Sequence, residues 1–186
     1  CLERCGPTAP AGLLGNGRID ERRRLEHASA AGSGCRGVSV ILWGVHILVY
    51  AFRSDSPYHE QSRRLIEGAR LGGKPYLLNT IVAASFVRLV TNQRIFAVPS
   101  ESAEAWRFLE FLEAEPTAHL VGIDAHTHAV FKHFCLVSDA RGNDVPDAFL
   151  AAVAVRNQAR LVTADRGFQR FPGLAVDVVE LADKEQ

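Results

Sequence analysis

Residues 141–171 read RGNDVPDAFLAAVAVRNQARLVTADRGFQRF, and this stretch decides the fold. Pro146 has no N–H, which suits it to the first turn of a helix, and Asp147 beside it suits the positive end of the helix dipole. The residues that follow are apolar on most sides, so we expect a buried helix that begins near Pro146. Residues 160–163 then read as a short inner strand that ends at Asp165.

The two carboxylates of this stretch lie at the ends of two expected elements. A helix followed by a strand is the order found in an α/β sheet, and in open α/β sheets ligands bind at the carboxyl ends of the strands. We therefore expect chemistry at Asp165, with Asp147 as its neighbour at a helix N-terminus. A solvated turn aspartate is the alternative for either residue taken alone.

Strand and helix patterns alternate along the rest of the chain. Further strands are expected at residues 38–43, 76–78, 119–123 and 175–181, and further helices at 46–53, 58–71, 80–90, 99–115 and 126–137. This alternation predicts a central parallel sheet with right-handed crossovers, and hence an α/β fold built as a three-layer α/β/α sandwich.

Composition and charge exclude several classes of protein. The chain has 186 residues, of which 47% are hydrophobic and 23% charged, so we expect one globular domain with a sizeable core. A formal charge of zero gives no overall basic field, so any RNA contact needs a local patch. The longest apolar stretch, residues 38–52, is too short to span a bilayer, and we expect no secretory signal. The spacing of Cys1, Cys5, Cys35 and Cys135 is not that of zinc ligands and fits a reducing, cytoplasmic setting.

The N-terminal stretch differs from the rest of the chain. Residues 1–37 are rich in Gly, Ala and Arg without sustained apolar periodicity, so we expect a disordered extension, with the domain formed by residues 38–186. A basic arm that binds RNA or a membrane surface is the alternative interpretation of the arginines at 22–24. Because the chain begins with Cys1 and contains no methionine, we expect it to be a fragment or an upstream extension of a reading frame.

Two sequence patterns carry a resemblance to a known family. They are Gly-Asn-x-x-x-Asp-Ala-x-Leu-Ala-Ala-x-Ala from Gly142 and Leu-Val-Thr-x-Asp-Arg-x-Phe-x-Arg-Phe-Pro-Gly-Leu from Leu161. With residues 47–53 and 86–92, they resemble the PIN-domain ribonucleases of the VapC toxin family over residues 38–182. The resemblance implies a PIN-like fold, an Mg²⁺-dependent endoribonuclease (with Mn²⁺ as an alternative ion) and RNA as substrate. It also implies the toxin of a type II toxin-antitoxin system with a VapB-like antitoxin as partner, a cytoplasmic homodimer and no membrane association.

In PIN domains similar to this chain, four acidic positions typically supply the site. Two of them match Asp147 and Asp165, to which the resemblance assigns catalysis and metal binding, and Asn143 is expected to bond into the site or to phosphate. The position that closes the first strand holds Gly44, and the second position holds Ser85. Because Mg²⁺ is an octahedral ion bound by oxygen ligands, we expect weakened or absent catalysis. A catalytically inactive protein that retains antitoxin or RNA binding is the alternative.

Other polar residues could join or replace these ligands. Gly167 stands where the family has an auxiliary acid. His46 could bind a softer metal with the two aspartates, although a histidine that is only hydrogen-bonded near the site is the simpler interpretation. Asp139 and Asp144 could compensate for lost acids, but loop charges facing water are the simpler interpretation. The histidines within 126–133 lie on an expected helix without a completing acid or cysteine, so we expect surface or half-buried residues.

Binding surfaces can also be predicted. An antitoxin peptide needs apolar pockets, and the helices expected at 46–71 and 80–92 offer the groove. Arg53, Arg88 and Arg166 are expected near the mouth of the site, where they would contact RNA phosphates or form ordinary salt bridges.

Overall fold

A five-stranded parallel sheet forms the centre of the protein. The structure is a computed structural model that describes residues 39–181, so the predicted N-terminal extension and the end of the chain lie outside the described residues. The strands are β1 (Ile41–Trp43), β2 (Tyr76–Leu78), β3 (Ala118–Leu120), β4 (Arg160–Thr163) and β5 (Val176–Val178). Their order across the sheet is β3-β2-β1-β4-β5, and each neighbouring pair is parallel.

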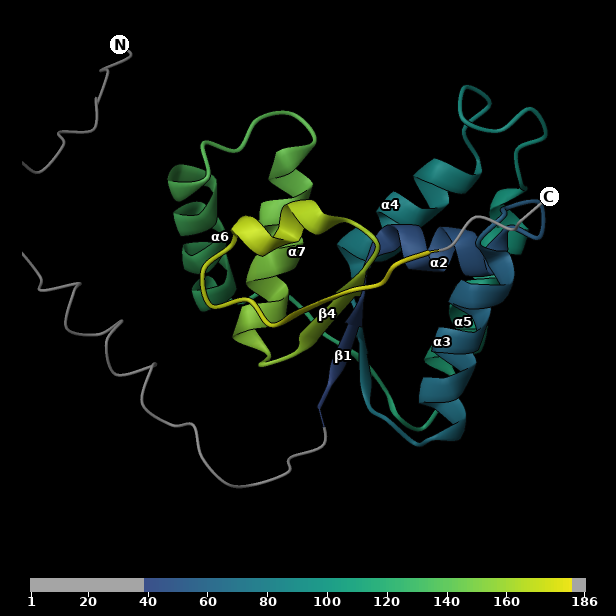
Figure 1. Cartoon of the computed structure of the whole chain (residues 1–186), viewed down its shortest axis with the longest axis horizontal. Coiled ribbons are helices and arrows are strands. Elements are labelled where there is room, and N and C mark those ends of the chain that lie inside the picture. Colours follow the sequence, from purple (N-terminus) through teal and green to yellow (C-terminus); the bar gives the residue numbers. More distant parts are fainter. Residues whose placement is uncertain (1–38, 182–186) are drawn as a thin grey trace, which may run out of the picture. The chain divides into compact units, whose positions relative to one another are not determined.

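Helices cover both faces of this sheet. They are α2 (Val45–Phe52), α3 (His59–Leu71), α4 (Thr80–Val90), α5 (Ser102–Glu113), α6 (Ala125–Val137), α7 (Asp144–Arg156) and the 3-10 helix η1 (Arg166–Arg170). The connections that leave β1 and β2 run across the sheet in one direction, and those that leave β3 and β4 run in the other. Right-handed crossovers therefore put α2 to α5 on one face and α6 and α7 on the other, as Figure 1 shows.

The predicted three-layer α/β/α sandwich is confirmed, with small differences at element ends. The predicted strand at 76–78 has the observed bounds, whereas β1 begins three residues later than predicted, at Ile41. α7 begins at Asp144, so Pro146 lies inside its first turn, where a missing N–H leaves no hydrogen bond unmade. The helix η1 was not predicted. No helix within residues 39–181 is long and apolar enough to cross a membrane.

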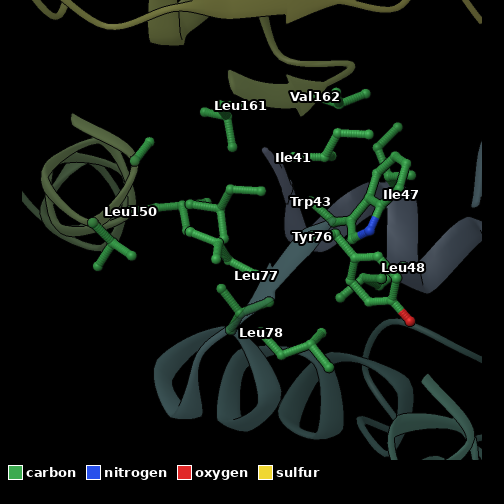
Figure 2. Packing of buried hydrophobic residues seen from close by; sticks show 14 of the residues in the cluster. Ile41, Trp43, Ile47, Leu48, Tyr76, Leu77, Leu78, Leu150, Leu161 and Val162 are labelled. Carbon is green, nitrogen blue, oxygen red and sulfur yellow. The ribbon is translucent and has the colours of Figure 1, made fainter. Parts of the chain in front are cut away.

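The core lies on both sides of the central strands because alternate residues of a strand point to opposite faces. Figure 2 shows Leu77 and Leu161 beside Leu150 of α7, whereas Trp43 and Tyr76 lie on the side of α2. The rings of Trp43 and Tyr76 are 6.4 Å apart between centroids, and both side chains are almost completely buried. Full burial of side chains of this size stabilises the fold by roughly 1.5–3 kcal/mol each, which fixes the strands that carry the site.

Helix α7 is buried on nearly every side. Four of its alanines, Ala148, Ala151, Ala152 and Ala154, have no exposed surface. Their small side chains let α6 and β4 approach the helix closely, as its apolar composition predicts. The N-terminus of α7 is thereby held in a fixed position relative to the end of β4.

Two buried polar side chains tie loops and helices to β2. The Asn79 side chain caps α4 by accepting a hydrogen bond from the Ile81 N–H at 2.8 Å, and it donates another to the Val121 carbonyl at 3.0 Å. The Tyr76 hydroxyl donates to the Leu112 carbonyl at 2.6 Å. Burial raises the pKa of Tyr76 to about 12, with a further contribution from the nearby negative charge of Glu115. Both side chains therefore stabilise the folded state through buried hydrogen bonds.

Candidate active site

The carboxyl ends of β1 and β4 meet where the direction of the crossovers reverses. β1 and β4 are neighbours in the sheet, with Trp43 opposite Val162, yet the connection after β1 leads away from the one after β4. Such a reversal leaves a crevice between the two loops, which is where ligands bind in open α/β sheets. Gly44 follows β1 and Asp165 follows β4, so both lie at this crevice.

Gly44 packs directly against β4. Its N–H donates to the Val162 carbonyl at 2.8 Å, and its φ of −64° and ψ of 144° are accessible to any residue. A Cβ atom added at this position would lie 2.8 Å from Oγ1 and 2.9 Å from Cβ of Thr163. Gly44, which the resemblance places at the family's first acidic position, thus has no side chain and no space for one without movement of the strand ends.

Asp165 is fixed by hydrogen bonds that belong to the turn after β4. Its Oδ1 accepts from the Gly167 N–H at 2.7 Å and caps η1, while its own N–H donates to Oγ1 of Thr163 at 3.1 Å. A Cβ atom at Gly167 would lie 2.9 Å from this Oδ1. A side chain at Gly167, where the resemblance predicts an auxiliary acid, would therefore crowd the capping oxygen of Asp165.

Asp147 lies in the first turn of α7 and is half-buried, as predicted for a helix N-terminus. Burial raises the pKa of the Asp147 carboxyl, and the nearby Asp165 carboxylate raises it further. Arg170 and, more weakly, His46 act in the opposite direction, while Asp144 adds to the increase. The charges of Asp147 and Asp165 therefore repel each other.

Arg170 is the residue of this site that the sequence interpretation missed. Its Nη2 atom lies 3.0 Å from Oδ1 of Asp144 and 3.3 Å from Oδ2 of Asp147. Its guanidinium carbon lies 4.9 Å from the centroid of the Phe171 ring. The available signal was a cation five residues after Asp165, but only the fold-back of η1 towards α7 places it on the acids.

The remaining candidates lie around this pair. Asn143 is exposed and makes no side-chain capping bond to α7, so it contributes no fixed contact. Ser85 is half-buried in α4 and brings no charge. His46 is exposed and stacks on Tyr50, with ring centroids 6.1 Å apart. Asp144 is not a loop charge as predicted, because it is the first residue of α7 and pairs with Arg170.

The other residues singled out by sequence have ordinary surroundings. Asp139 is exposed and pairs with Arg141, as expected for a charge facing water. Arg166 pairs with Glu180, and Arg53 pairs with Asp55, which is the salt-bridge interpretation of these arginines. The histidines at 126, 128 and 133 are exposed, as expected.

The donor set does not fit a complete divalent-cation site. Within residues 39–181, no group of three or more His, Cys, Asp or Glu side chains could hold a metal ion. Asp147 and Asp165 supply two carboxylates, Gly44 and Ser85 supply none, and Arg170 already neutralises part of the negative charge. Mg²⁺ needs near-octahedral oxygen coordination, so the described side chains alone leave most of its positions unfilled.

A separate apolar groove lies at the far end of α2. It has a volume of about 780 Å³ and is lined by the end of α2, the segment before α5, and α5 itself. Val98 and Phe111 in its wall are strongly exposed, and the wall also holds two arginines and two acids, which are Arg53, Arg107, Asp55 and Glu104. Its walls come from α2 and α5, whereas the helices expected to form the antitoxin groove are those at 46–71 and 80–92.

Comparison with known proteins identifies relatives over most of the chain. The PIN domain family matches residues 45–174. The chain is 39% identical over 127 residues to ribonuclease VapC43 of Mycobacterium tuberculosis, covering 68% of this chain and 86% of that protein. It is 38% identical over 133 residues to ribonuclease VapC25 of the same organism, covering 71% of this chain and 93% of that protein.

Solved structures agree in fold. VapBC2 from Rickettsia felis, bound to a DNA fragment from its promoter, has a TM-score of 0.57 at 18% identity and covers 74% of this chain and 97% of the matched chain. FitAcB from Neisseria gonorrhoeae has a TM-score of 0.51 at 17% identity and covers 73% and 95%. At these identities the likeness concerns the fold.

Proposed function

We propose, from the premise that this chain belongs to the VapC ribonuclease family of PIN-domain proteins, that it is the toxin of a type II toxin-antitoxin system with a weakened endoribonuclease site. The observation that carries this proposal is Gly44 at the crevice, where the family's first carboxylate would stand beside Asp147 and Asp165. The substrate is RNA, and the setting is the cytoplasm.

The size of the defect follows from electrostatics. At an effective dielectric constant of about 20, a unit charge 4 Å from an ion contributes about 4 kcal/mol, and a divalent ion gains more. The missing carboxylate therefore weakens ion binding by at least roughly 10² to 10³-fold. Two repelling carboxylates at the crevice also disfavour the approach of an RNA phosphate. We therefore expect low cleavage activity in the presence of Mg²⁺ or Mn²⁺.

The antitoxin is the second partner that we propose. The groove between α2 and α5 offers the apolar wall that an inserted peptide needs, with Val98, Phe108 and Phe111 exposed or partly exposed. VapBC2 and FitAcB support this assignment as relatives in fold. A homodimer, as the resemblance implies, completes the proposed assembly.

A catalytically inactive binding protein is the second candidate. It is favoured by one observation, the absence of a three-donor group among residues 39–181. In this case the chain keeps the groove and binds the antitoxin or RNA without cleavage.

Restoration of the missing acid tests the proposal. Full-length protein and Gly44→Asp are incubated with structured RNA and Mg²⁺ or Mn²⁺, and cleavage is followed on gels. We expect at least a tenfold gain, equivalent to about 1.4 kcal/mol of transition-state stabilisation. Gly68→Asp is the matched control, because Gly68 is exposed in α3 with no atom within 4 Å of an added Cβ.

Each other outcome has a definite meaning. Equal, substantial cleavage by the unchanged chain and by Gly44→Asp would show that another ligand has replaced the acid, and the proposed weakening would be wrong. Absence of cleavage in both, with Gly44→Asp folded, would favour the inactive binding protein. A gain in Gly68→Asp as well would show that added negative charge, and not its position, is responsible.

A further inference from the structure

Arg170 lies at the crevice and contacts two acidic side chains, those of Asp144 and Asp147. We infer that its guanidinium group is the resident cation of this crevice, and that it excludes a divalent ion from Asp147 in the absence of RNA. The inference rests on the proposed function in one respect, since it takes the crevice to be the family's acidic site. Its basis is the pair of contacts from one nitrogen, Nη2, to Oδ1 of Asp144 at 3.0 Å and to Oδ2 of Asp147 at 3.3 Å.

The position of Arg170 is fixed by the helix η1 and by a buried aromatic ring. It is the last residue of η1, whose first turn is capped by the Asp165 carboxylate. The guanidinium also lies over the ring of Phe171, which is buried and packs against Phe134 at 5.2 Å between centroids. Because one short helix carries Asp165 at its start and Arg170 at its end, the cation is already in place when the fold forms.

The other arginine of η1 shows that this arrangement is specific. Arg166 has a side chain that is 73% exposed, and it pairs with Glu180, which is 84% exposed. The Arg170 side chain is 34% exposed, and its partner Asp147 is 30% exposed. Charge pairs that are partly removed from water are screened less, so the contact at Arg170 holds more strongly than the one at Arg166.

The chemistry of the two kinds of cation explains why the arginine prevails. Guanidinium is planar, weakly hydrated and always charged, and it binds carboxylates without a complete coordination sphere. Mg²⁺ and Mn²⁺ need oxygen ligands that Gly44 no longer supplies. An ion that reached Asp147 would have to break the contact with Arg170 and would also be repelled by its positive charge. The ligand set is thus incomplete for the family's metal, and the Arg170 side chain takes the place of that ion beside Asp147.

Mn²⁺ binding without RNA tests this inference on the full-length chain. The free and bound ion are distinguished by electron paramagnetic resonance for the unchanged chain, Arg170→Gln and Arg170→Met. The methionine keeps an unbranched stem that can pack on Phe171, in case the glutamine variant does not fold. We expect both variants to bind Mn²⁺ at least tenfold more tightly than the unchanged chain, which corresponds to about 1.4 kcal/mol.

Two controls separate charge from other effects. Arg170→Lys retains the positive charge and is expected to stay close to the unchanged chain. Arg166→Gln removes a positive charge from the same helix without a contact to the acids, and is expected to leave Mn²⁺ binding unchanged. Melting curves with and without Mn²⁺ confirm folding and should show stabilisation by the ion in Arg170→Gln alone among the glutamine variants.

The outcomes distinguish this inference from the proposed function. Equal Mn²⁺ affinity in the unchanged chain and in a folded Arg170 variant would overturn the inference, as would tight binding in Arg170→Lys. RNA cleavage by Gly44→Asp is a separate readout. If Arg170→Gln binds Mn²⁺ more tightly while Gly44→Asp does not cleave RNA, the inference that Arg170 is the resident cation would hold. The proposed ribonuclease function would be wrong.

Discussion

Replacement of Gly44 by alanine isolates the contact between the ends of β1 and β4. The φ and ψ angles of Gly44 suit alanine, so a backbone penalty is not expected. The added Cβ would lie 2.8 Å from Oγ1 of Thr163 and 3.2 Å from the Val162 carbonyl oxygen, both inside ordinary van der Waals separation. Overpacking of this kind costs about 1–3 kcal/mol, whereas the lower entropy of the unfolded chain returns about 0.4–1 kcal/mol. We expect a net loss of about 1 kcal/mol in the free energy of unfolding.

Urea unfolding followed by the fluorescence of Trp43 and Trp106 measures this loss. Gly68→Ala is the control, since Gly68 is solvent-exposed, lies away from the ends of α3, and has no atom within 4 Å of an added Cβ. Alanine there should stabilise the protein by about 0.5–1 kcal/mol because glycine is a poor helix former. The two substitutions should therefore shift the midpoint in opposite directions. A Gly44→Ala variant that is stabilised as much as Gly68→Ala would refute the close packing of Gly44 on β4.

Three further predictions concern polar side chains. Tyr76→Phe should lose about 1 kcal/mol near pH 7. Because the folded pKa of Tyr76 is raised to about 12, the unchanged chain should lose up to about 2.7 kcal/mol as pH rises from about 10 to 12, and urea titrations across this range should show no such loss in Tyr76→Phe. Asn79→Ala removes a cap and a buried bond, so a loss of about 2 kcal/mol is expected in urea unfolding, and a loss below about 0.5 kcal/mol would contradict it. Because the pKa of Asp147 is raised by folding, its protonated carboxyl group stabilises the folded state. This contribution is fully present below the unfolded pKa and is lost as pH rises through the folded pKa. Asp147→Asn should therefore raise the melting temperature near neutral pH and raise it less near pH 4; an equal gain at both would show that charge is not the cause.

The sheet could be predicted because its signals are local. The pair Leu161 and Val162 and the turn residues around it set the bounds of β4, and Pro146 with Asp147 marked the start of α7 to within two residues. β3 was placed one residue too late and ended too late, because it is an edge strand. Leu120 at its end is 69% exposed, and Ile123 beyond it is 54% exposed. An apolar side chain in this region therefore does not indicate burial.

The proximity of the two aspartates was predictable, but the cation beside Asp147 was not. Topology alone places strand ends and helix starts at one crevice, and this brought Asp147 and Asp165 together. The course of η1 depends on the capping of its first turn by Asp165 and on burial of the ring of Phe171, which are tertiary contacts. The acidic partner of an arginine cannot be chosen from the sequence until such contacts are known. Gly44, in contrast, stands in the sequence at the position where the resemblance predicts the family's first acid.

The alanines of α7 offer a direct spectroscopic view of the crevice. Ala148 follows Asp147, and Ala151 lies one turn further along the helix, both without exposed surface. An alanine methyl has no rotamers, so its chemical shift reports the local backbone and the rings nearby. Isotopic labelling of alanine methyl groups would place nuclear magnetic resonance reporters directly beneath the acids without any substitution. Ions, RNA and an antitoxin could then each be detected through the same signals.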